Sequence, residues 1–525
     1  MLVVYAASFY SGSLWDDNVF IFKAEAITKS PHPFVFFDYT SSNHRAWPLG
    51  YVFFWILYRV FAENFIWYKV LNLLVHFSNF YLLRRFLQNL RIKHSFFMSL
   101  LFLFHPLQVE SVSWIFQLNT LLATSFVLLC LNCLLENKYR LSLLFFALSL
   151  LTKSYAVFVP FICILILQKH FTFKQSVLRS IPFFIISLIV GLLTIRGVNS
   201  SDKESQIRER FHTQNAQKTV KEESIVAIPS PTPAIVENEE AISLSDENEV
   251  APETIEVVES TEPQELAQEV VVEQAITPPP EPTPVTMTVI KERKVFDWVS
   301  FAHTKLQLMA NSISFYLQTF LVGRDHFLFY PLIDPLALEN IYNLLLFFLF
   351  ITAYLFFLAD KKVIQTNSFL MATLFVCAWL PISGIFYVPF MKFAHYSDHW
   401  AYLCTIPLSV LLIQAINHLI TRFNLRNKMS SLMIGLIFAM PISFNLIKTI
   451  QYSSVFNDHE QMLRRNILHN PKNTFVRRYL AAKLHRNGET RYAIEELIKA
   501  QTIDPGNMEV KVQLDYYKDQ LKKEK

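Results

Sequence analysis

The stretch Phe104-His105-Pro106-Leu107-Gln108-Val109-Glu110-Ser111-Val112-Ser113-Trp114 is a polar block between two apolar runs, at residues 95–105 and 112–135. Apolar runs near the length that crosses a bilayer predict membrane helices. An ionisable residue at the end of such a helix is costly to hold there, so His105 and Glu110 are candidates for a functional site. A second polar block, Trp15-Asp16-Asp17-Asn18, follows the short apolar N-terminus.

The composition is typical of a helical membrane protein. Hydrophobic residues make up 52% of the 525 residues, charged residues only 17%, and there are 9 Gly against 49 Phe. We therefore expect an all-α fold, a polytopic bundle of about eleven transmembrane helices. Residues 49–62 carry Arg59 and suit an interfacial helix better than a span. The expected spans cover residues 1–14, 65–83, 95–105, 112–135, 141–152, 155–168, 177–196, 339–358, 368–386, 402–420 and 429–448.

Basic residues are concentrated in alternate loops of this arrangement. The loops between them hold few, namely Arg45, Lys153 and Lys392. By the positive-inside rule the basic set faces the cytoplasm, which puts the N-terminus inside and the C-terminus outside. Both polar blocks then share the outer compartment with the C-terminal segment. The basic set consists of Arg84, Arg85, Arg91, Lys93, Lys138, Arg140, Lys169, Lys174, Arg179, Lys361, Lys362, Arg422, Arg426 and Lys428.

Four regions follow from these patterns. We expect an N-terminal membrane part at 1–198, an acidic external linker at 199–295, interfacial helices with a second membrane part at 296–450, and an external helical domain at 455–525. Residues 221–290 contain ten Pro and sixteen acidic residues against one Lys, with no Gly and no aromatic residue. Such a segment buries too little apolar surface to fold alone, so it reads as a disordered spacer or a tail for a partner.

The C-terminal region has the spacing of a tetratricopeptide repeat, because Pro471 and Pro505 lie 34 residues apart. A generic helical hairpin is the alternative. We expect residues 456–470 to be part of a preceding unit and 507–523 to be a capping helix. Because one complete repeat is below the usual minimum of about three, it must lean on the membrane part or on a partner. The expected inner positions are Leu480, Ala481, Leu484, Ala493, Leu497 and Ala500.

The polar blocks suggest acid–base chemistry at the outer surface. One carboxylate of Asp16 and Asp17 would act as general base on an acceptor hydroxyl while its neighbour orients it, or both are ordinary solvated acids. His105 and Glu110 flank Pro106 and would lie near one another, for proton transfer or as a helix cap. Lys153 would bind a lipid-linked phosphate or pair with an acid.

Other features favour structural readings. Asn72, His76 and Asn79 form one polar stripe on an apolar span, and interhelical hydrogen bonding explains it more simply than a site. The chain has no Gly-rich phosphate loop, which disfavours an ATP-driven reaction, and no convincing ligand set for a metal. Nothing points to a nucleic-acid partner.

The order of motifs resembles the transmembrane and tetratricopeptide-repeat glycosyltransferases of the GT-C superfamily, which includes protein O-mannosyltransferases. The resemblance spans nearly the whole chain apart from the linker, and its strongest element is the His105–Trp114 block. Two positions depart from it. Relatives often have Lys-Glu where this chain has Lys153-Ser154, and Asp-Arg-Tyr where it has Asp398-His399-Trp400. The motifs are the acid pair, Arg45 with Pro48, Asn72-x-x-x-His76-x-x-Asn79, His105-Pro106-x-x-Val109-Glu110-Ser111-Val112-x-Trp114, Leu150-Leu151-Thr152-Lys153 and Asp398-x-x-x-Tyr402-Leu403.

The resemblance implies transfer of a sugar, mannose among the candidates, from a polyprenyl-phosphate donor to an acceptor, with inversion at the anomeric carbon. The donor would be the only cofactor-like molecule. An Asp of the first external loop would be the base, with Asp17 preferred over Asp16. The repeats would offer a groove for an acceptor protein, on its Ser or Thr. The donor phosphate and sugar would contact Arg45, His105, Glu110, Lys153, Lys392, Asp398 and Tyr402.

Two other classes remain open. A non-catalytic membrane scaffold would use its repeats to hold an envelope complex, and the altered positions Ser154 and His399 favour it. A transporter is weaker, because its polar groups should lie near the middle of the membrane. Scarce cysteine fits a bacterial inner membrane with the C-terminus in the periplasm, and the alternative is the endoplasmic reticulum with the C-terminus in the lumen.

Overall fold

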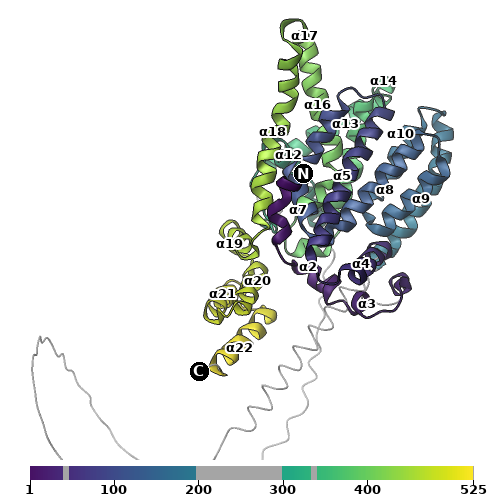
Figure 1. The fold of residues 1–525 in the computed structure, drawn as a ribbon. Helices are drawn as coiled ribbons and strands as arrows, with labels where there is room; N and C mark the ends of the chain where they lie inside the picture. Colours follow the sequence, from purple (N-terminus) through teal and green to yellow (C-terminus); the bar gives the residue numbers. More distant parts are fainter. Residues whose placement is uncertain (39–46, 197–297, 333–339, 524–525) are drawn as a thin grey trace, which may run out of the picture. The chain divides into compact units, whose positions relative to one another are not determined.

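A computed structural model describes residues 1–38, 47–196, 298–332 and 340–523 (Figure 1). Every regular element within these ranges is a helix, so the expected all-α class is confirmed for this part of the chain. The predicted linker at 199–295 and the candidate residue Arg45 lie outside the described residues.

The helices of the apolar part follow the apolar runs closely. The predicted run at 141–152 is the helix α9, Tyr139–Thr152, and the run at 65–83 extends to Asn89 in α5. The remaining helices of this part are α4 Pro48–Phe61, α6 Ser95–Leu103, α7 Val109–Ser113, α8 Leu118–Leu135, α10 Val159–Leu167, the helix Phe173–Arg196, α12 Trp298–Val322, α13 Ile341–Ala359, α14 Lys361–Ile364, α15 Asn367–Trp379, α16 Thr405–Arg422, α17 Leu425–Lys428 and α18 Ser431–Val455.

Three helical stretches are long and apolar enough to cross a membrane, namely Ile115–Leu135, Phe173–Arg196 and Ser431–Val455. A fourth crossing is possible if Ser95–Leu103 and Pro106–Ser113, which meet at 55°, act as one broken span. This is compatible with a membrane protein, but eleven spans are not confirmed. The break falls at His105 and Pro106, because proline lacks the N–H that would continue the helix.

The first predicted segment differs from expectation, whereas the region after the linker is helical as predicted. Instead of one span over residues 1–14, the chain forms α1, Leu2–Tyr5, and a 3₁₀ turn, Ala6–Tyr10, which are too short to cross a bilayer. The region at 296–338, predicted as interfacial or re-entrant, begins with the single 25-residue helix α12. One face of α12 is buried through Ala310, Ile313, Tyr316 and Phe320.

The basic connections come together at one end of the helices. Arg85, after the middle of α5, pairs with Glu136 beyond α8, with 2.5 Å between Nη2 and Oε1. Lys169 donates to the Asn367 side chain at 3.1 Å, and Asn367 donates to the carbonyl of Leu90 at 3.0 Å. Figure 1 shows α14 and α17 at this end, and α4 at the opposite end with the short helices α2, Trp15–Asp17, and α3, Glu25–Thr28.

The C-terminal region forms four helices, α19 His459–His469, α20 Thr474–Arg486, α21 Thr490–Ile503 and α22 Met508–Lys523. All six predicted inner positions, from Leu480 to Ala500, are buried. A tight turn at Gly488, with φ of +87°, joins α20 to α21. Positive φ is strained for residues with a Cβ, which explains the glycine.

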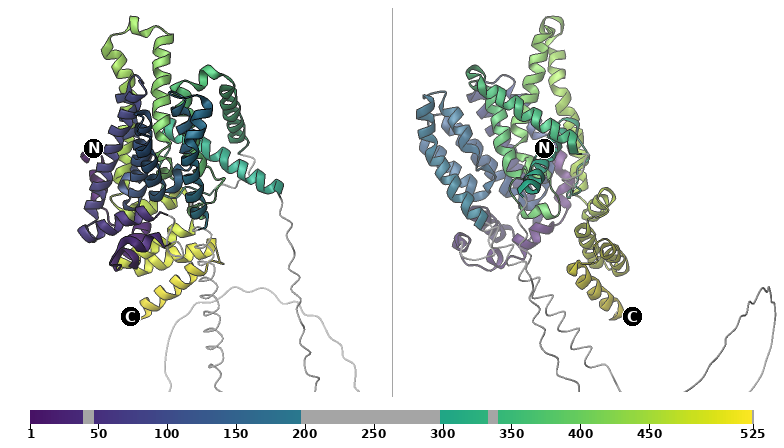
Figure 2. Two further views of the ribbon diagram at one scale, coloured as in Figure 1. Left: turned by 90° about the vertical axis from the view of Figure 1, so that its right-hand side faces the viewer. Right: turned by 180° about the vertical axis from the view of Figure 1, so that it is seen from behind.

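These C-terminal helices do not stand apart from the rest of the described chain. Their buried residues Met462, Leu480 and Leu497 belong to one hydrophobic cluster with Leu14 of the first loop and Trp114 of the polar block. Figure 2 shows α19–α22 next to the purple N-terminal segment in its side view. The C-terminal helices therefore pack against the apolar part.

Candidate functional site

The first loop is anchored through Asp17, which is 1% exposed. Its Oδ2 accepts the N–H of Leu14 at 2.8 Å, and its Oδ1 accepts the N–H of Phe116 at 2.8 Å. Phe116 lies in the 3₁₀ turn Ile115–Gln117 that follows the polar block. Asp17 thereby joins the first loop to the segment after Trp114. Asp16 is also buried, at 5% exposure.

Lys69 of α5 holds the segment that leads into this loop. Its Nζ donates to the carbonyls of Ser8 and Ser11, both at 2.7 Å, and to the Ser11 hydroxyl. Lys69 is 1% exposed, so its charge is compensated inside the protein. No motif pointed to this residue. The available signal was a lone lysine within a predicted apolar span.

Burial raises the pKa of Asp17 to about 7, although the N–H groups of Leu14 and Phe116 and the charge of Lys69 lower it. The negative charge of Asp16 raises it further. A carboxyl with a pKa near neutrality can exchange protons at physiological pH, which is the property a general acid or base needs. The first loop therefore carries a proton-exchanging group.

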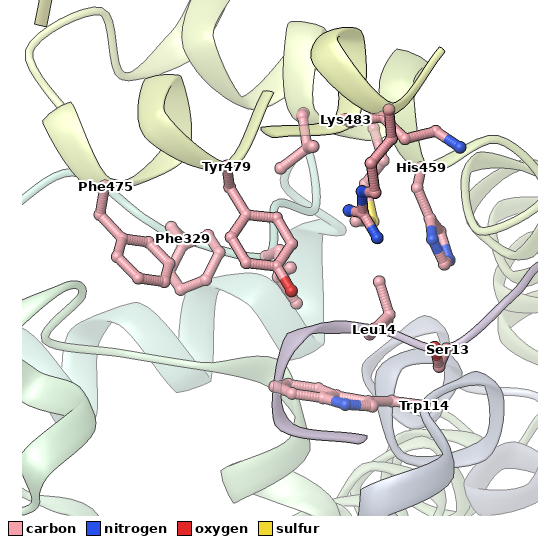
Figure 3. A pocket seen from close by; sticks show the side chains of 12 residues that line it. Ser13, Leu14, Trp114, Phe329, His459, Phe475, Tyr479 and Lys483 are labelled. Atoms are coloured by element: carbon pink, nitrogen blue, oxygen red, sulfur yellow. The ribbon is translucent and has the colours of Figure 1, made fainter. Parts of the chain in front are cut away.

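A small cavity opens beside this loop (Figure 3). Its volume is about 30 Å³. Tyr479, on its wall, is influenced by charges of both signs. Burial raises the pKa of its hydroxyl, the charge of Arg486 lowers it, and the charges of Asp17 and Asp16 raise it. The cavity is thus within electrostatic reach of the acid pair. It is lined by Ser13, Leu14, Trp114, Leu328, Phe329, His459, Met462, Leu463, Phe475, Tyr479, Lys483 and Arg486.

Lys153 contacts the same turn, Ile115–Gln117, through the side chain of Gln117. Its Nζ donates to Gln117 Oε1 at 3.2 Å and to Thr120 Oγ1 at 2.6 Å. It also lies 5.8 Å from the ring centre of Trp47, whose indole N–H donates to Ser154 Oγ at 3.0 Å. Gln117 is the neighbour of Phe116, so Asp17 and Lys153 contact the same short turn.

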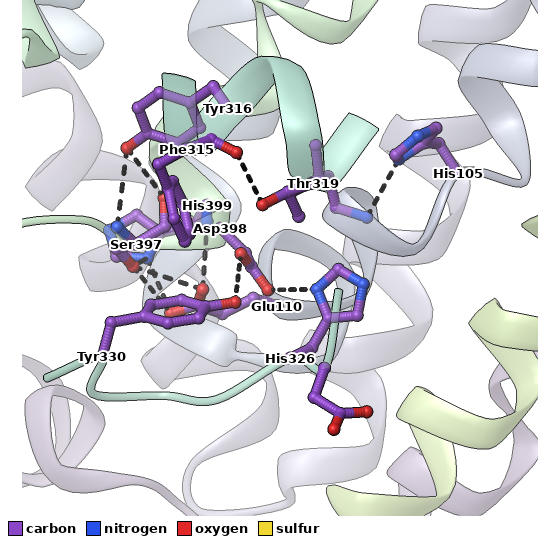
Figure 4. Close-up of polar contacts among 12 residues, drawn as sticks. His105, Glu110, Phe315, Tyr316, Thr319, His326, Tyr330, Ser397, Asp398 and His399 are labelled. Carbon is purple, nitrogen blue, oxygen red and sulfur yellow. Dashed lines mark hydrogen bonds and ion pairs between the residues drawn. The ribbon is translucent and has the colours of Figure 1, made fainter. Parts of the chain in front are cut away.

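Glu110 and Asp398 form a second, fully buried group (Figure 4). Glu110 Oε1 lies 2.8 Å from His399 Nδ1, and its Oε2 accepts the N–H of His399 at 3.0 Å. The Ser397 hydroxyl donates to both oxygens of Glu110. His399, one of the positions at which this chain departs from the motif of the resembling family, therefore contacts Glu110 directly.

Asp398 uses both of its oxygens in the same group. Its Oδ2 lies 2.8 Å from His326 Nδ1, and its Oδ1 accepts the hydroxyl of Tyr330 at 2.9 Å. Neither His326 nor Tyr330 was predicted, since they come from a region with no recognisable polar motif. A buried carboxylate is stable when its oxygens are satisfied in this way. The group has the character of an internal network.

His105 is held by backbone contacts, and not by Glu110. Its Nδ1 accepts the N–H of Leu107 at 3.2 Å, which caps the 3₁₀ turn Pro106–Gln108. Its Nε2 lies 3.2 Å from the carbonyl of Phe320, and the two rings stack with centroids 4.5 Å apart. The helix-cap alternative describes His105 better than a role in proton transfer.

The polar stripe on α5 hydrogen-bonds to other elements of the bundle. Tyr402, a predicted donor-site residue, is 0% exposed, and its hydroxyl lies 2.6 Å from His76 Nδ1 and 3.2 Å from Asn79 Nδ2. Asn72 donates to the carbonyl of Trp114 at 3.0 Å. The structural reading of the stripe is supported, and Tyr402 belongs to it.

The predicted site residues thus fall into separate places. Asp16, Asp17 and Lys153 adjoin the turn after Trp114, whereas Glu110 and Asp398 lie in the internal network. Lys392 is exposed, with its Nζ 5.0 Å from the ring centre of Phe393. The contacts of the remaining candidates, His105 and Tyr402, are structural.

Within the described ranges, no three His, Cys, Asp or Glu side chains are grouped closely enough to hold a metal ion. Comparison of the chain with models of known protein families, with curated proteins and with solved structures found no match.

Proposed function

We propose that this protein is a membrane glycosyltransferase of the GT-C type, which transfers a sugar from a polyprenyl-phosphate donor to an acceptor hydroxyl such as that of a protein Ser or Thr. One observation carries the proposal. Asp17 of the acid pair and Lys153 are both hydrogen-bonded to the same turn, Ile115–Gln117, beside a cavity whose Tyr479 is influenced by the charges of both carboxylates. A carboxylate base and a phosphate-binding cation are the two groups that this reaction needs.

In this proposal Asp16 is the general base and Asp17 is a positioning residue. Both oxygens of Asp17 already accept backbone N–H groups, so its main contribution is to hold the loop. Asp16 takes the proton of the acceptor hydroxyl, and the acceptor oxygen forms a bond to the anomeric carbon of the sugar. The bond from that carbon to the phosphate oxygen breaks, and the electron pair leaves with the polyprenyl phosphate. Attack opposite the leaving group inverts the anomeric centre.

Lys153 is proposed to bind the leaving phosphate. It is half-buried and already oriented by Gln117 and Thr120, which lowers the conformational cost of contacting a ligand. The cation lies against the ring of Trp47, as an ammonium does when it is partly removed from water. Exposed Lys392 is a weaker candidate for the same role.

The membrane arrangement belongs to the proposal as well. The shorter apolar helices Pro48–Phe61, Tyr139–Thr152, Ile341–Phe356 and Asn367–Ile382 would lie within the membrane beside the longer ones. The end that carries the basic connections would face the cytoplasm, and the acid pair and the helices α19–α22 would face the periplasm or a lumen. Lipid-linked sugar donors fit such an outer site, because their polyprenyl chain stays in the bilayer.

A membrane scaffold is the second candidate, and one observation favours it. Glu110, Asp398 and Tyr402 are completely buried, and each accepts a hydrogen bond from another buried residue, as in a purely structural core. The donors are, in the same order, His399, Tyr330 and Asn79. A scaffold needs such a network only for stability and needs no proton exchange at Asp16.

The test is sugar transfer by the purified full-length protein in lipid, with a panel of polyprenyl-phosphate sugars and acceptor peptides containing Ser and Thr. Asp16→Asn is expected to abolish turnover without changing the thermal midpoint, whereas Glu63→Gln, an exposed acid between α4 and α5, is the matched control. Equal turnover in Asp16→Asn and the unmodified protein would contradict the assignment of the base. No turnover with any donor, together with no donor binding, would favour the scaffold.

A further inference from the structure

The cavity beside the first loop is built from two parts of the chain that are distant in sequence. Leu14, Trp114 and Phe329 contribute one side, and α19 and α20 contribute the other through His459, Tyr479 and their neighbours. Figure 3 shows Tyr479 and Trp114 on opposite sides of the space, with His459 and Lys483 beside it. The apolar part and the repeat helices therefore meet at a shared, partly polar pocket.

The polar groups that line this pocket are predominantly donors. Trp114 is 1% exposed, and its indole N–H, which can only donate, has no hydrogen-bond partner in the described part of the chain. The buried Nε2 of His459 also lacks a partner there. Lys483 and Arg486 add two cationic donors at the pocket. Since a buried donor without a partner has lost its hydration without gaining a hydrogen bond, the arrangement points to a ligand that supplies acceptors.

Lys483 and Arg486 differ from the other arginines of α20 in that no ion pair within the described part of the chain neutralises their charges. Arg477 of α20 pairs with Glu496 at 2.6 Å, and Arg478 pairs with Glu509. Among the described residues no acidic side chain forms an ion pair with Lys483 or Arg486, although Arg486 Nε donates to the carbonyl of Ala482. The positive charge that acts on Asp17 is that of Lys69, so these two cations are not needed to compensate it.

The electrostatic surroundings of His459 agree with an excess of positive charge. Burial lowers the pKa of His459 to about 4, the positive charges of Lys69, Lys483 and Arg486 lower it further, and the negative charge of Asp458 raises it. His459 is therefore neutral at physiological pH. A neutral imidazole can donate one hydrogen bond, and a negatively charged ligand would be attracted by the three cations around it.

We propose that this pocket binds a carboxylate of the acceptor polypeptide, next to the hydroxyl that receives the sugar. This inference rests on the proposed function in naming the acceptor. A cavity of about 30 Å³ has room for a group of two or three heavy atoms, which suits a carboxylate. The aromatic side chains of Phe329, Phe475 and Tyr479 would contact the apolar part of the same or the neighbouring acceptor residue.

A polypeptide ligand is favoured over a lipid headgroup by the origin of the cations. Both Lys483 and Arg486 come from α20, whose other outward residues are mostly polar or charged, as in a helix that faces water. Arg486 is exposed, which places the entrance at the water-accessible side of that helix. Acceptor segments rich in Asp or Glu around the modified Ser or Thr would be selected.

The test is binding of fluorescent 12-residue peptides to the full-length protein in phosphatidylcholine nanodiscs. One peptide alternates Asp with Ser, and its matched partner alternates Asn with Ser. We expect the Asp peptide to bind at least about tenfold more tightly, since hydrogen bonds to a charged acceptor are stronger than those to a neutral amide. Lys483→Gln and Trp114→Phe should each reduce that preference, whereas Lys472→Gln, an exposed lysine between α19 and α20 that does not line the pocket, should leave it unchanged.

Equal binding of the two peptides, or an equal effect of Lys472→Gln and Lys483→Gln, would overturn the inference. Stronger competition by polyprenyl-phosphate vesicles than by the Asp peptide would overturn it in favour of a lipid phosphate. Arg486→Gln, an exposed position, repeats the test if Lys483→Gln fails to fold. A preserved Asp preference without any sugar transfer would contradict only the proposed function, whereas transfer without an Asp preference would contradict only the pocket.

Discussion

The Oδ1 atom of Asp17 accepts the backbone N–H of Phe116, with 2.8 Å between oxygen and nitrogen, across 99 residues of sequence. This contact fastens the first loop to the turn that follows the His105–Trp114 block. It also explains why two unrelated polar motifs are needed together. The loop contributes Asp17, and the turn after the His105–Trp114 block contributes the backbone N–H to which Asp17 is hydrogen-bonded.

Two acceptor oxygens are needed at position 17, because the backbone N–H groups of Leu14 and Phe116 both donate to Asp17. In Asp17→Asn one oxygen becomes an NH₂ group, which faces the N–H of Leu14 or Phe116 and leaves that donor unpaired. We expect a loss of about 1–3 kcal/mol in the free energy of unfolding, measured in detergent by denaturant titration. Glu63→Gln is the exposed control. An unchanged midpoint for Asp17→Asn would show that the loop is held by other contacts.

The contribution of Asp17 to the stability of the protein should fall as the pH rises toward and through 7. Because burial raises the pKa of Asp17 from 3.8 to about 7, the folded state favours the protonated carboxyl. Its contribution is full below about pH 4 and is lost as the pH rises through about 7. We expect the difference in the free energy of unfolding between the unmodified protein and Asp17→Asn to change by roughly 1 kcal/mol per pH unit between pH 5 and 7. Parallel curves for the two proteins would contradict this assignment.

Lys69 should be one of the most sensitive positions in the described chain. Lys69→Met keeps the length of the side chain but leaves the carbonyls of Ser8 and Ser11 without their donor. It also removes the positive charge that lowers the pKa of Asp17. We expect destabilisation by about 3 kcal/mol, and a shift of the Asp17 titration to higher pH. Lys93→Met, at an exposed lysine before α6, is the comparison, and similar effects for both would be inconsistent with the buried role.

His105 is predicted to support folding and not the chemical step. His105→Phe keeps an aromatic ring against Phe320 but loses the contacts to the N–H of Leu107 and the carbonyl of Phe320. The free energy of unfolding should fall by about 1–3 kcal/mol. Transfer rate per folded molecule should stay within about threefold of the unmodified protein, a difference of less than 1 kcal/mol in activation free energy. A loss of a hundredfold at full folding would restore His105 to the site.

The packing of the C-terminal helices depends on small residues at their contacts. Ala493 is 0% exposed, so Ala493→Leu would force extra atoms between α20 and α21. We expect destabilisation by about 1–3 kcal/mol, seen as faster amide hydrogen exchange in α19–α22. Glu495→Leu introduces the same side chain at an exposed position two residues away and should have little effect. Equal exchange in both variants would argue against close helix packing at this site.

Most helix positions could be predicted from the sequence because apolar runs end at charged residues. The run at 141–152 matches α9 to within two residues, and the spacing of Pro471 and Pro505 predicts α20 and α21 with their buried alanines. The prediction of one span over residues 1–14 differs from the two short helical segments observed. This stretch carries Ser8, Ser11 and Ser13, and the backbone carbonyls of Ser8 and Ser11 accept hydrogen bonds from the Lys69 ammonium. Hydropathy does not register such a local polar contact.

The site was only partly predictable, for a related reason. Sequence motifs mark residue types, and so Asp17 and Lys153 could be named as candidates, which the structure brings to the same turn. They do not reveal partners that lie far away in the chain, such as His326, which is 72 residues from Asp398, or Tyr479 at the cavity. Motifs also do not distinguish a buried network from an open site, and the structure buries the donor-site candidates Glu110 and Tyr402 completely.

The most direct test of the central claim is the rate of sugar transfer from a polyprenyl-phosphate donor by Asp16→Asn, compared with the unmodified protein at equal thermal stability. The proposed base predicts a loss of at least about a thousandfold, at the level of removing a general base, with an inverted anomeric centre in the product of the unmodified protein. Transfer at an unchanged rate in Asp16→Asn, or a product with retained configuration, would contradict it.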